Sequence, residues 1–110
     1  MKQFNAIELQ EFSTEKRVRK TLSREGKLSV DVVFYENGQG TPEHQHKRQD
    51  EVFYVLDGTG TMIVDRENLP MKKGDIIQVP SGSKHGIKND SGAQLSMMFI
   101  KNSPASQGEN

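Results

Sequence analysis

Short apolar runs, each closed by a turn signal, constrain this chain more than any other feature of its sequence. They are rich in β-branched and aromatic residues and span 28–36, 51–58, 60–65, 74–80 and 95–101. Each run has the length of a β-strand. Between them lie the turn sequences ENGQGTP, LDGTG, DREN, PSGS and NDSG. Because no long 3.6-residue periodicity intervenes, the pattern predicts an all-β sandwich or barrel.

The chain is short enough to form one domain. Its 110 residues contain no internal repeat and no linker, so a single domain over 1–110 is predicted. The clearest turn is the hairpin at Asp57-Gly58, because glycine tolerates positive φ. The first 25 residues are ambiguous: VRKTLS fits an edge strand, and FNAIEL fits a short strand or a helical turn. Residues 102–110 are expected to be a frayed tail.

Composition excludes several classes of partner and site. Lys and Arg together number 15, and Asp and Glu together also number 15, so the chain has no net charge. Neither nucleic acid nor an anionic membrane is therefore expected as a partner. The basic run KRVRKTLSR at 16–24 is expected to be a solvated strand face. There is no cysteine, which excludes disulfides and thiolate metal ligands. No apolar h-region or membrane span is found, so the cytoplasm is the expected location.

Two of the three histidines lie one residue apart, in the segment HQHKRQDE. Alternate residues of a strand face the same side, so His44 and His46 would present both imidazoles to one centre if this segment is extended. Glu51 follows after a polar gap and opens a strand on which it shares a face with Phe53 and Val55. Because Phe53 and Val55 are apolar, this face is predicted to be interior. A glutamate at the mouth of an apolar face is costly unless it is paired or binds a cation.

The third histidine completes a plausible ligand set. His85 follows a Pro/Gly turn that can return the chain to the same centre. Three imidazoles and one carboxylate suit a divalent transition metal such as iron, manganese, nickel or zinc. Four protein ligands leave an open position on a five- or six-coordinate ion, as catalysis requires. Neutral histidine is the ligand, so binding should weaken at low pH. The alternative is that the histidines are scattered surface residues.

The spacing of these residues resembles the two motifs of the cupin superfamily. In residues 38–58 the glycines at both ends, His44, His46 and Glu51 occupy every fixed position of the first motif, G-x5-HxH-x(3,4)-E-x6-G. In residues 74–89 the second motif, G-x5-PxG-x2-H-x3-N, is complete and includes His85 and Asn89. Together the motifs cover about half of the chain. The joint match is far more specific than an isolated HxH pair.

The resemblance implies a fold and a site. The fold is a double-stranded β-helix, a jelly-roll β-barrel of the RmlC-like cupin type. In cupins the metal lies inside the barrel, and the matching ligands here are His44, His46, Glu51 and His85. The motif glycines, Pro80 and Asn89 are expected to shape turns rather than the site. Small cupins often form homodimers, so a homodimer is the implied assembly.

Function is constrained less tightly, since one fold supports many activities. The favoured hypothesis is a metal-dependent enzyme on a small polar molecule. Uronate-processing cupins tend to carry Gln at the position of Glu51 and Asp in the last strand. This chain has neither, which favours a dioxygenase-like over a sugar isomerase- or lyase-like activity. The alternatives are a non-catalytic small-molecule-binding or sensor domain, and a structural metal with an empty pocket.

No general acid or base can be assigned from the sequence. Tyr54 alternates with the face of Glu51 and is expected to point away, whereas Tyr35 either acts as an acid or packs in the core. In the last strand, the pocket is lined either by Met97 and Phe99 or by Met98 and Ile100. The flanking cations either steer an anionic substrate or are solvated loop residues. These cations are Lys47, Arg48, Lys84 and Lys88.

Overall fold

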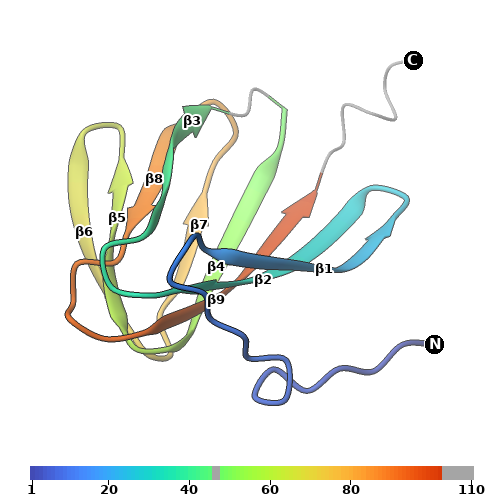
Figure 1. The fold of residues 1–110 in the computed structure, drawn as a ribbon. Coiled ribbons are helices and arrows are strands. Elements are labelled where there is room, and N and C mark those ends of the chain that lie inside the picture. The colour runs from blue at the N-terminus through green and yellow to red at the C-terminus, as the bar shows by residue number, and fades with distance from the viewer. Residues whose placement is uncertain (46–47, 103–110) are drawn as a thin grey trace.

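The structure is a computed structural model that describes residues 1–45 and 48–102, and it confirms the all-β prediction (Figure 1). Within that part of the chain, nine strands form two antiparallel sheets and no helix is present. The five-stranded sheet has the order β1 (Val18–Glu25), β2 (Leu28–Tyr35), β9 (Leu95–Asn102), β4 (Asp50–Asp57) and β7 (Ile76–Val79). The four-stranded sheet has the order β3 (Gly40–Gln45), β8 (Lys84–Lys88), β5 (Thr59–Val64) and β6 (Glu67–Lys72).

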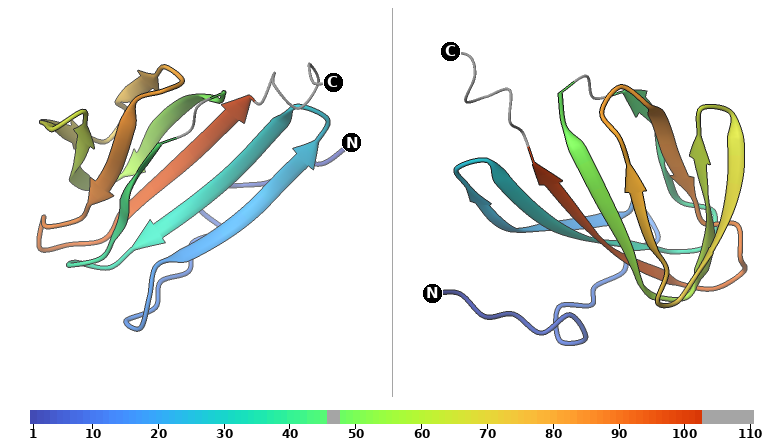
Figure 2. Two further views of the ribbon diagram at one scale, coloured as in Figure 1. Left: turned by 90° about the horizontal axis from the view of Figure 1, so that it is seen from above. Right: turned by 180° about the vertical axis from the view of Figure 1, so that it is seen from behind.

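The two sheets face each other and bring together strands that are distant in sequence. β9 lies between β2 and β4, and β8 lies between β3 and β5. These crossovers produce the jelly-roll arrangement, which limits exposed sheet edges. The sheets meet at the lower end of Figure 1 and diverge toward the upper end, and the views in Figure 2 agree. The ends of β3 and β9 and the starts of β4 and β8 lie at this wider end.

The predicted runs become strands β2, β4, β5, β7 and β9, and VRKTLS lies in the edge strand β1. The segment FNAIEL forms a helical turn, in which the Leu9 amide donates to the Asn5 carbonyl at 3.1 Å. Strand β6 was not predicted, because ENLPMK is polar and contains Pro70. Proline is tolerated there because β6 is the outer strand of its sheet.

The core lies between the sheets. Inward-facing residues of β2, β4 and β9 are almost fully buried, and Met62, Met71 and Ile87 close the core from the other sheet. Met97 and Phe99 belong to this cluster, so they are the inward-facing pair of the last strand. Phe99 packs edge-on against Phe53, with ring centroids 4.8 Å apart. Such aromatic pairs add to the burial of their apolar area.

Turn residues from the two motifs close the narrower end. Gly58 has a φ of 88°, and a Cβ there would overlap the backbone carbonyl of Gln94. Asn89 is buried, and its Nδ2 donates to the carbonyls of Tyr35 and Ala93 at 3.2 and 2.8 Å. Its Oδ1 accepts from the Ser91 hydroxyl at 2.7 Å. The prediction that Asn89 closes its loop is confirmed.

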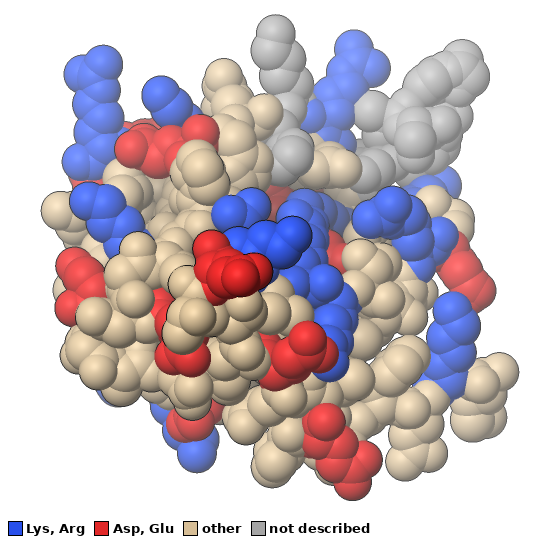
Figure 3. Space-filling model, viewed as in Figure 1, with Lys and Arg blue, Asp and Glu red and all other residues tan. Residues whose placement is uncertain are grey.

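The basic run at 16–24 is not simply a solvated face, which corrects the expectation from sequence. Arg17 Nη1 donates to the Gly40 carbonyl at 3.1 Å, and Lys20 Nζ donates to the Leu9 carbonyl at 2.9 Å. Arg19 forms an ion pair across the sheet. On the side of the molecule shown in Figure 3, Lys and Arg side chains gather near the middle, and Asp and Glu side chains lie directly against them. No helix in the described ranges has the length and apolarity needed to cross a bilayer.

Candidate metal centre

Two strands of one sheet and one strand of the other bring the predicted ligands together. His44 on β3 and His85 on β8 are directly paired across the four-stranded sheet. Glu51 lies on β4 of the opposite sheet, and the three side chains meet between the sheets at the wider end of the barrel. The strand alternation that placed Glu51 with Phe53 and Val55 on an interior face is confirmed, since all three are buried.

The distances suit a single metal ion. One ligand atom from each of the three residues lies within 4.8 Å of the others. His85 Nε2 and Glu51 Oε1 are 2.9 Å apart. Two ligands at right angles, each about 2.1 Å from a metal, would be separated by about 3 Å. The rings of His44 and His85 have centroids 4.5 Å apart, and one nitrogen of each ring faces the same small volume.

Backbone carbonyls orient both imidazole rings. His44 Nδ1 is 2.9 Å from the Pro42 carbonyl oxygen, and His85 Nδ1 is 3.3 Å from that of Ser83. A neutral ring that donates its Nδ1 proton to a carbonyl keeps the Nε2 lone pair for a metal. His85 turns Nε2 toward Glu51 Oε1, so this nitrogen and the carboxylate face the same small volume. These contacts fit a metal-binding pair of histidines.

The carboxylate of Glu51 is held in a charged and buried environment. Its side chain is 2% exposed, and Lys101 Nζ lies 3.9 Å from its second oxygen. Burial alone lowers the pKa of His85, but the hydrogen bond and charge of Glu51 and the Ser83 carbonyl outweigh burial and raise it. Burial likewise lowers the pKa of Lys101, and Glu51 opposes that effect. Phe53 packs edge-on against His85, with ring centroids 5.4 Å apart, and forms an apolar wall of the cavity.

Some predictions about this centre lie beyond what the structure tests. His46 and Lys47 fall outside the described residues, as do residues 103–110 of the expected tail. His46 therefore stays a predicted member of the ligand set. The single-domain boundaries and the homodimer also stay predictions. Asn102, the first residue of the expected tail, ends strand β9.

The other candidate residues are placed clearly. Tyr54 lies on the face of β4 opposite to Glu51, as expected from strand alternation. Tyr35 is buried in the core, and its hydroxyl shares a 2.7 Å hydrogen bond with Thr41. Tyr35 belongs to the buried core cluster, which supports packing as its role, and burial raises its pKa to about 12. Lys84 and Lys88 are exposed and alternate with the inward-facing His85.

Two cations of the site were missed from the sequence. Lys101 shares the inward face of Phe99 and is paired across the sheet with Glu51. Arg19 lies on the edge strand β1 and bonds Asp31 Oδ2 through Nη2 at 2.6 Å. Strand alternation puts Lys101 on the face of Phe99, but the sequence did not decide whether that face turns inward. No local signal marked Arg19, because it reaches the site only through the pairing of β1 with β2.

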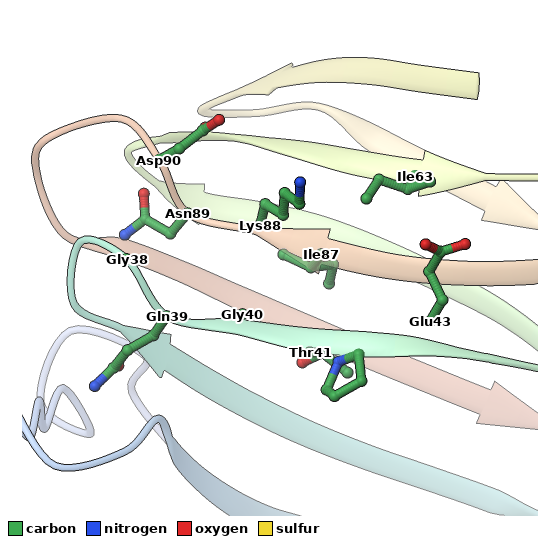
Figure 4. A pocket seen from close by; sticks show the side chains of 11 residues that line it. Gly38, Gln39, Gly40, Thr41, Glu43, Ile63, Ile87, Lys88, Asn89 and Asp90 are labelled. Atoms are coloured by element: carbon green, nitrogen blue, oxygen red, sulfur yellow. The ribbon is translucent and has the colours of Figure 1, made fainter. Parts of the chain in front are cut away.

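The centre lies in a very small cavity. The space between the candidate ligands, Arg19 and Lys101 has a volume of about 20 Å³. That is room for about one water-sized group. A separate surface groove of about 440 Å³ crosses β3, β5 and β8, where Glu43, Ile63 and Lys88 project together (Figure 4). None of the three described candidate ligands lines that groove.

A profile described as "Cupin domain" matches residues 31–101. This chain belongs to the cupin family. The RmlC-like cupin protein of Desulfovibrio desulfuricans has a similar crystal structure, with a TM-score of 0.83 and 20% identity, covering 93% of this chain and 96% of that one. The similarity shows the fold, which is the predicted RmlC-like jelly roll.

Curated relatives share the motif region. The oxalate-binding protein of Thermotoga maritima is 29% identical over 63 residues, which is 57% of this cupin and 52% of that protein. Quercetin 2,3-dioxygenase of Bacillus subtilis is 33% identical over 54 residues, which is 49% of this cupin and 16% of the enzyme. The chain spans about half the length of the first curated relatives it matches, 55% and 52%.

Proposed function

We propose that this cupin binds one divalent transition metal through His44, His46, Glu51 and His85 and uses it to act on a small polar molecule. The observation that carries the proposal is the orientation of the two described histidines. Each Nδ1 faces a backbone carbonyl, and one ligand atom from each histidine and from Glu51 falls within 4.8 Å. A buried carboxylate beside two such imidazoles suits a divalent cation.

Within this proposal the chain's own residues have distinct tasks. His44 and His85 hold the metal from one sheet, and Glu51 holds it from the other. Phe53 and Phe99 form the apolar floor and limit the entry of water from the core side. When bound, the metal supplies Lewis acidity or redox chemistry at an open coordination position.

A dioxygenase-like activity is favoured over a sugar isomerase- or lyase-like one. The inward face of β9 carries Met97, Phe99 and Lys101, and none of these is a carboxylate. A relative with dioxygenase activity shares the motif region. The inner cavity of about 20 Å³ admits only a small group, so the substrate or its reacting part must be small.

A second candidate is non-catalytic binding of a small molecule. Among the described residues that line the inner cavity, the ionisable side chains apart from the candidate ligands are Arg19 and Lys101. Both are cations, which suit ligand binding better than proton abstraction at neutral pH. The name of the oxalate-binding relative is in keeping with this candidate.

Elemental analysis tests the metal site. Protein purified without chelator or affinity metal should contain about one transition metal per chain, and His44→Ala and His46→Ala should each lose most of it. Lys88→Ala is the matched control, because it changes an exposed residue of a ligand-bearing strand. No metal in the native protein after reconstitution would refute the proposal.

The element and its reactivity separate the two candidates. Iron with dioxygen uptake that depends on an added substrate would support the dioxygenase. Tight binding without turnover would support the binding domain. Zinc with every coordination position filled by protein would instead indicate a structural metal, and it would contradict both.

A further inference from the structure

A hollow of about 330 Å³ opens beside the candidate metal centre, and we call it the vestibule. Its lining comes from the β1–β2 hairpin, the end of β9 and the segment before β4. The lining includes Arg19, Arg24, Lys27 and Lys101. Arg19 and Lys101 line both the vestibule and the inner cavity. The vestibule therefore adjoins the inner cavity at these two side chains.

The charges in this approach have one sign. Among the described residues, the ionisable side chains that line the vestibule are Arg19, Arg24, Lys27 and Lys101, and all four are cations. The inner cavity adds one carboxylate, Glu51. The whole chain has no net charge, so this concentration of cations is local. A cleft lined by one sign of charge attracts and concentrates ligands of the opposite sign.

The two innermost cations are held in place. The Lys101 side chain is 13% exposed and lies 3.9 Å from Glu51. Asp31, which is 1% exposed, accepts a hydrogen bond from Arg19 Nη2 at 2.6 Å. A guanidinium fixed by one carboxylate is pre-organised to present its other donors to a second one.

We propose that the vestibule selects a small carboxylate, which Lys101 and Arg19 bind while another of its oxygens reaches the metal centre. This assignment of substrate class rests on the metal-dependent function proposed above. A cavity of about 20 Å³ has room for about one oxygen atom of a ligand, so the rest of the molecule must stay in the vestibule. The vestibule limits the remainder of the molecule to a few carbon atoms.

A charge-only comparison of ligands tests the proposal. Calorimetric titration of the metal-loaded protein would compare malonate with malonamide, its neutral analogue, and with inorganic phosphate. Malonate should bind at least tenfold more tightly than malonamide, and more tightly than phosphate. The preference over malonamide should shrink when NaCl is raised from about 20 to about 200 mM.

Variants of the cations locate the binding. Lys101→Met should lose about tenfold in malonate affinity while retaining its metal, because the metal ligands are unchanged. Arg24→Gln should lose less, since this side chain is exposed at the rim. Lys84→Gln is the control, as it removes an exposed cation that alternates with His85. Equal binding of malonate and malonamide, tighter binding of phosphate, or an unchanged Lys101→Met would overturn the proposal.

Metal content separates this proposal from the function on which it rests. If the protein binds metal but does not prefer malonate, the carboxylate assignment alone fails. If it binds no metal but still binds malonate through Lys101, the metal-dependent function fails and the anion preference of the vestibule is supported.

Discussion

The ion pair between Arg19 and Asp31 gives a prediction with a calculable size. The Asp31 side chain is 1% exposed, the Arg19 side chain is 39% exposed, and their closest atoms are 2.6 Å apart. Removing one partner of a fully buried pair costs about 3–5 kcal/mol, because a charge stays buried without its partner. Arg19 is more than a third exposed, so solvent screening reduces the expected cost of Arg19→Met to about 2 kcal/mol at neutral pH.

The same pair predicts how this cost depends on pH. Burial raises the pKa of Asp31, but the hydrogen bond from Thr21 and the Arg19 guanidinium outweigh it, so the folded-state pKa lies below 3.8. A carboxylate with a lowered pKa stabilises the fold above its unfolded pKa. That stabilisation is lost as the pH falls through the folded value. The difference between wild type and Arg19→Met should therefore shrink below about pH 4.

Urea unfolding followed by circular dichroism measures this difference. Any bound metal should be removed with chelator first, since a ligand bound only to the folded state shifts the apparent stability. At neutral pH, Arg19→Met should lower the midpoint temperature by about 8–10 °C in a parallel thermal scan. In an Asp31→Asn background the same substitution should cost less than about 0.5 kcal/mol.

Arg24→Met is the matched control for this experiment. It removes an exposed cation from the same strand and should change the stability by less than about 0.5 kcal/mol. The reasoning is refuted if Arg19→Met costs no more than this control. It is equally refuted if the cost is the same at about pH 3 as at pH 7.

Three further substitutions test the fold. Asn89→Ala should cost about 2–3 kcal/mol, because it leaves the carbonyls of Tyr35 and Ala93 without their side-chain donor; a loss below about 1 kcal/mol in urea unfolding would contradict the loop-closing role. Gly58→Ala should destabilise by at least about 1 kcal/mol through its φ of 88° and overlap with a backbone carbonyl, whereas an unchanged midpoint would show that the hairpin relaxes. Because the pKa of Tyr35 is about 12, Tyr35→Phe should leave the spectrophotometric titration unchanged below about pH 11, and a smaller absorbance change below that pH would contradict the burial of its hydroxyl.

The strand pattern and the two motifs predicted the barrel, and three of the four candidate ligands lie in the described residues and come together in the structure. Strand alternation placed Glu51 on an interior face, and the turn before His85 returned it to the same centre. Such features are local, since each depends on residues a few positions apart. Strand β6 escaped prediction because an exposed outer strand needs neither apolar residues nor a proline-free sequence.

The cations of the vestibule could not be predicted in the same way. Both Met97 and Met98 are apolar, so alternation alone did not show which face of β9 turns inward and hence where Lys101 points. Arg19 reaches the cavity through the register of β1 against β2, which pairs it with Val33 and sets it near Asp31. Register between strands depends on long-range packing, and a shift of one residue would reverse every side chain.

The side chains of the candidate site come from both sheets. The four-stranded sheet contributes His44 and His85, whereas the five-stranded sheet contributes Glu51, Lys101 and Arg19. The histidine rings are oriented by carbonyls two residues away in their own segments, and neither Arg19 nor Lys101 takes part in those hydrogen bonds. If the vestibule selects ligands as proposed, substitutions at Arg19 or Lys101 should alter which molecule binds while the imidazoles stay in place. This separation offers a physical reason why one metal-holding fold supports many activities.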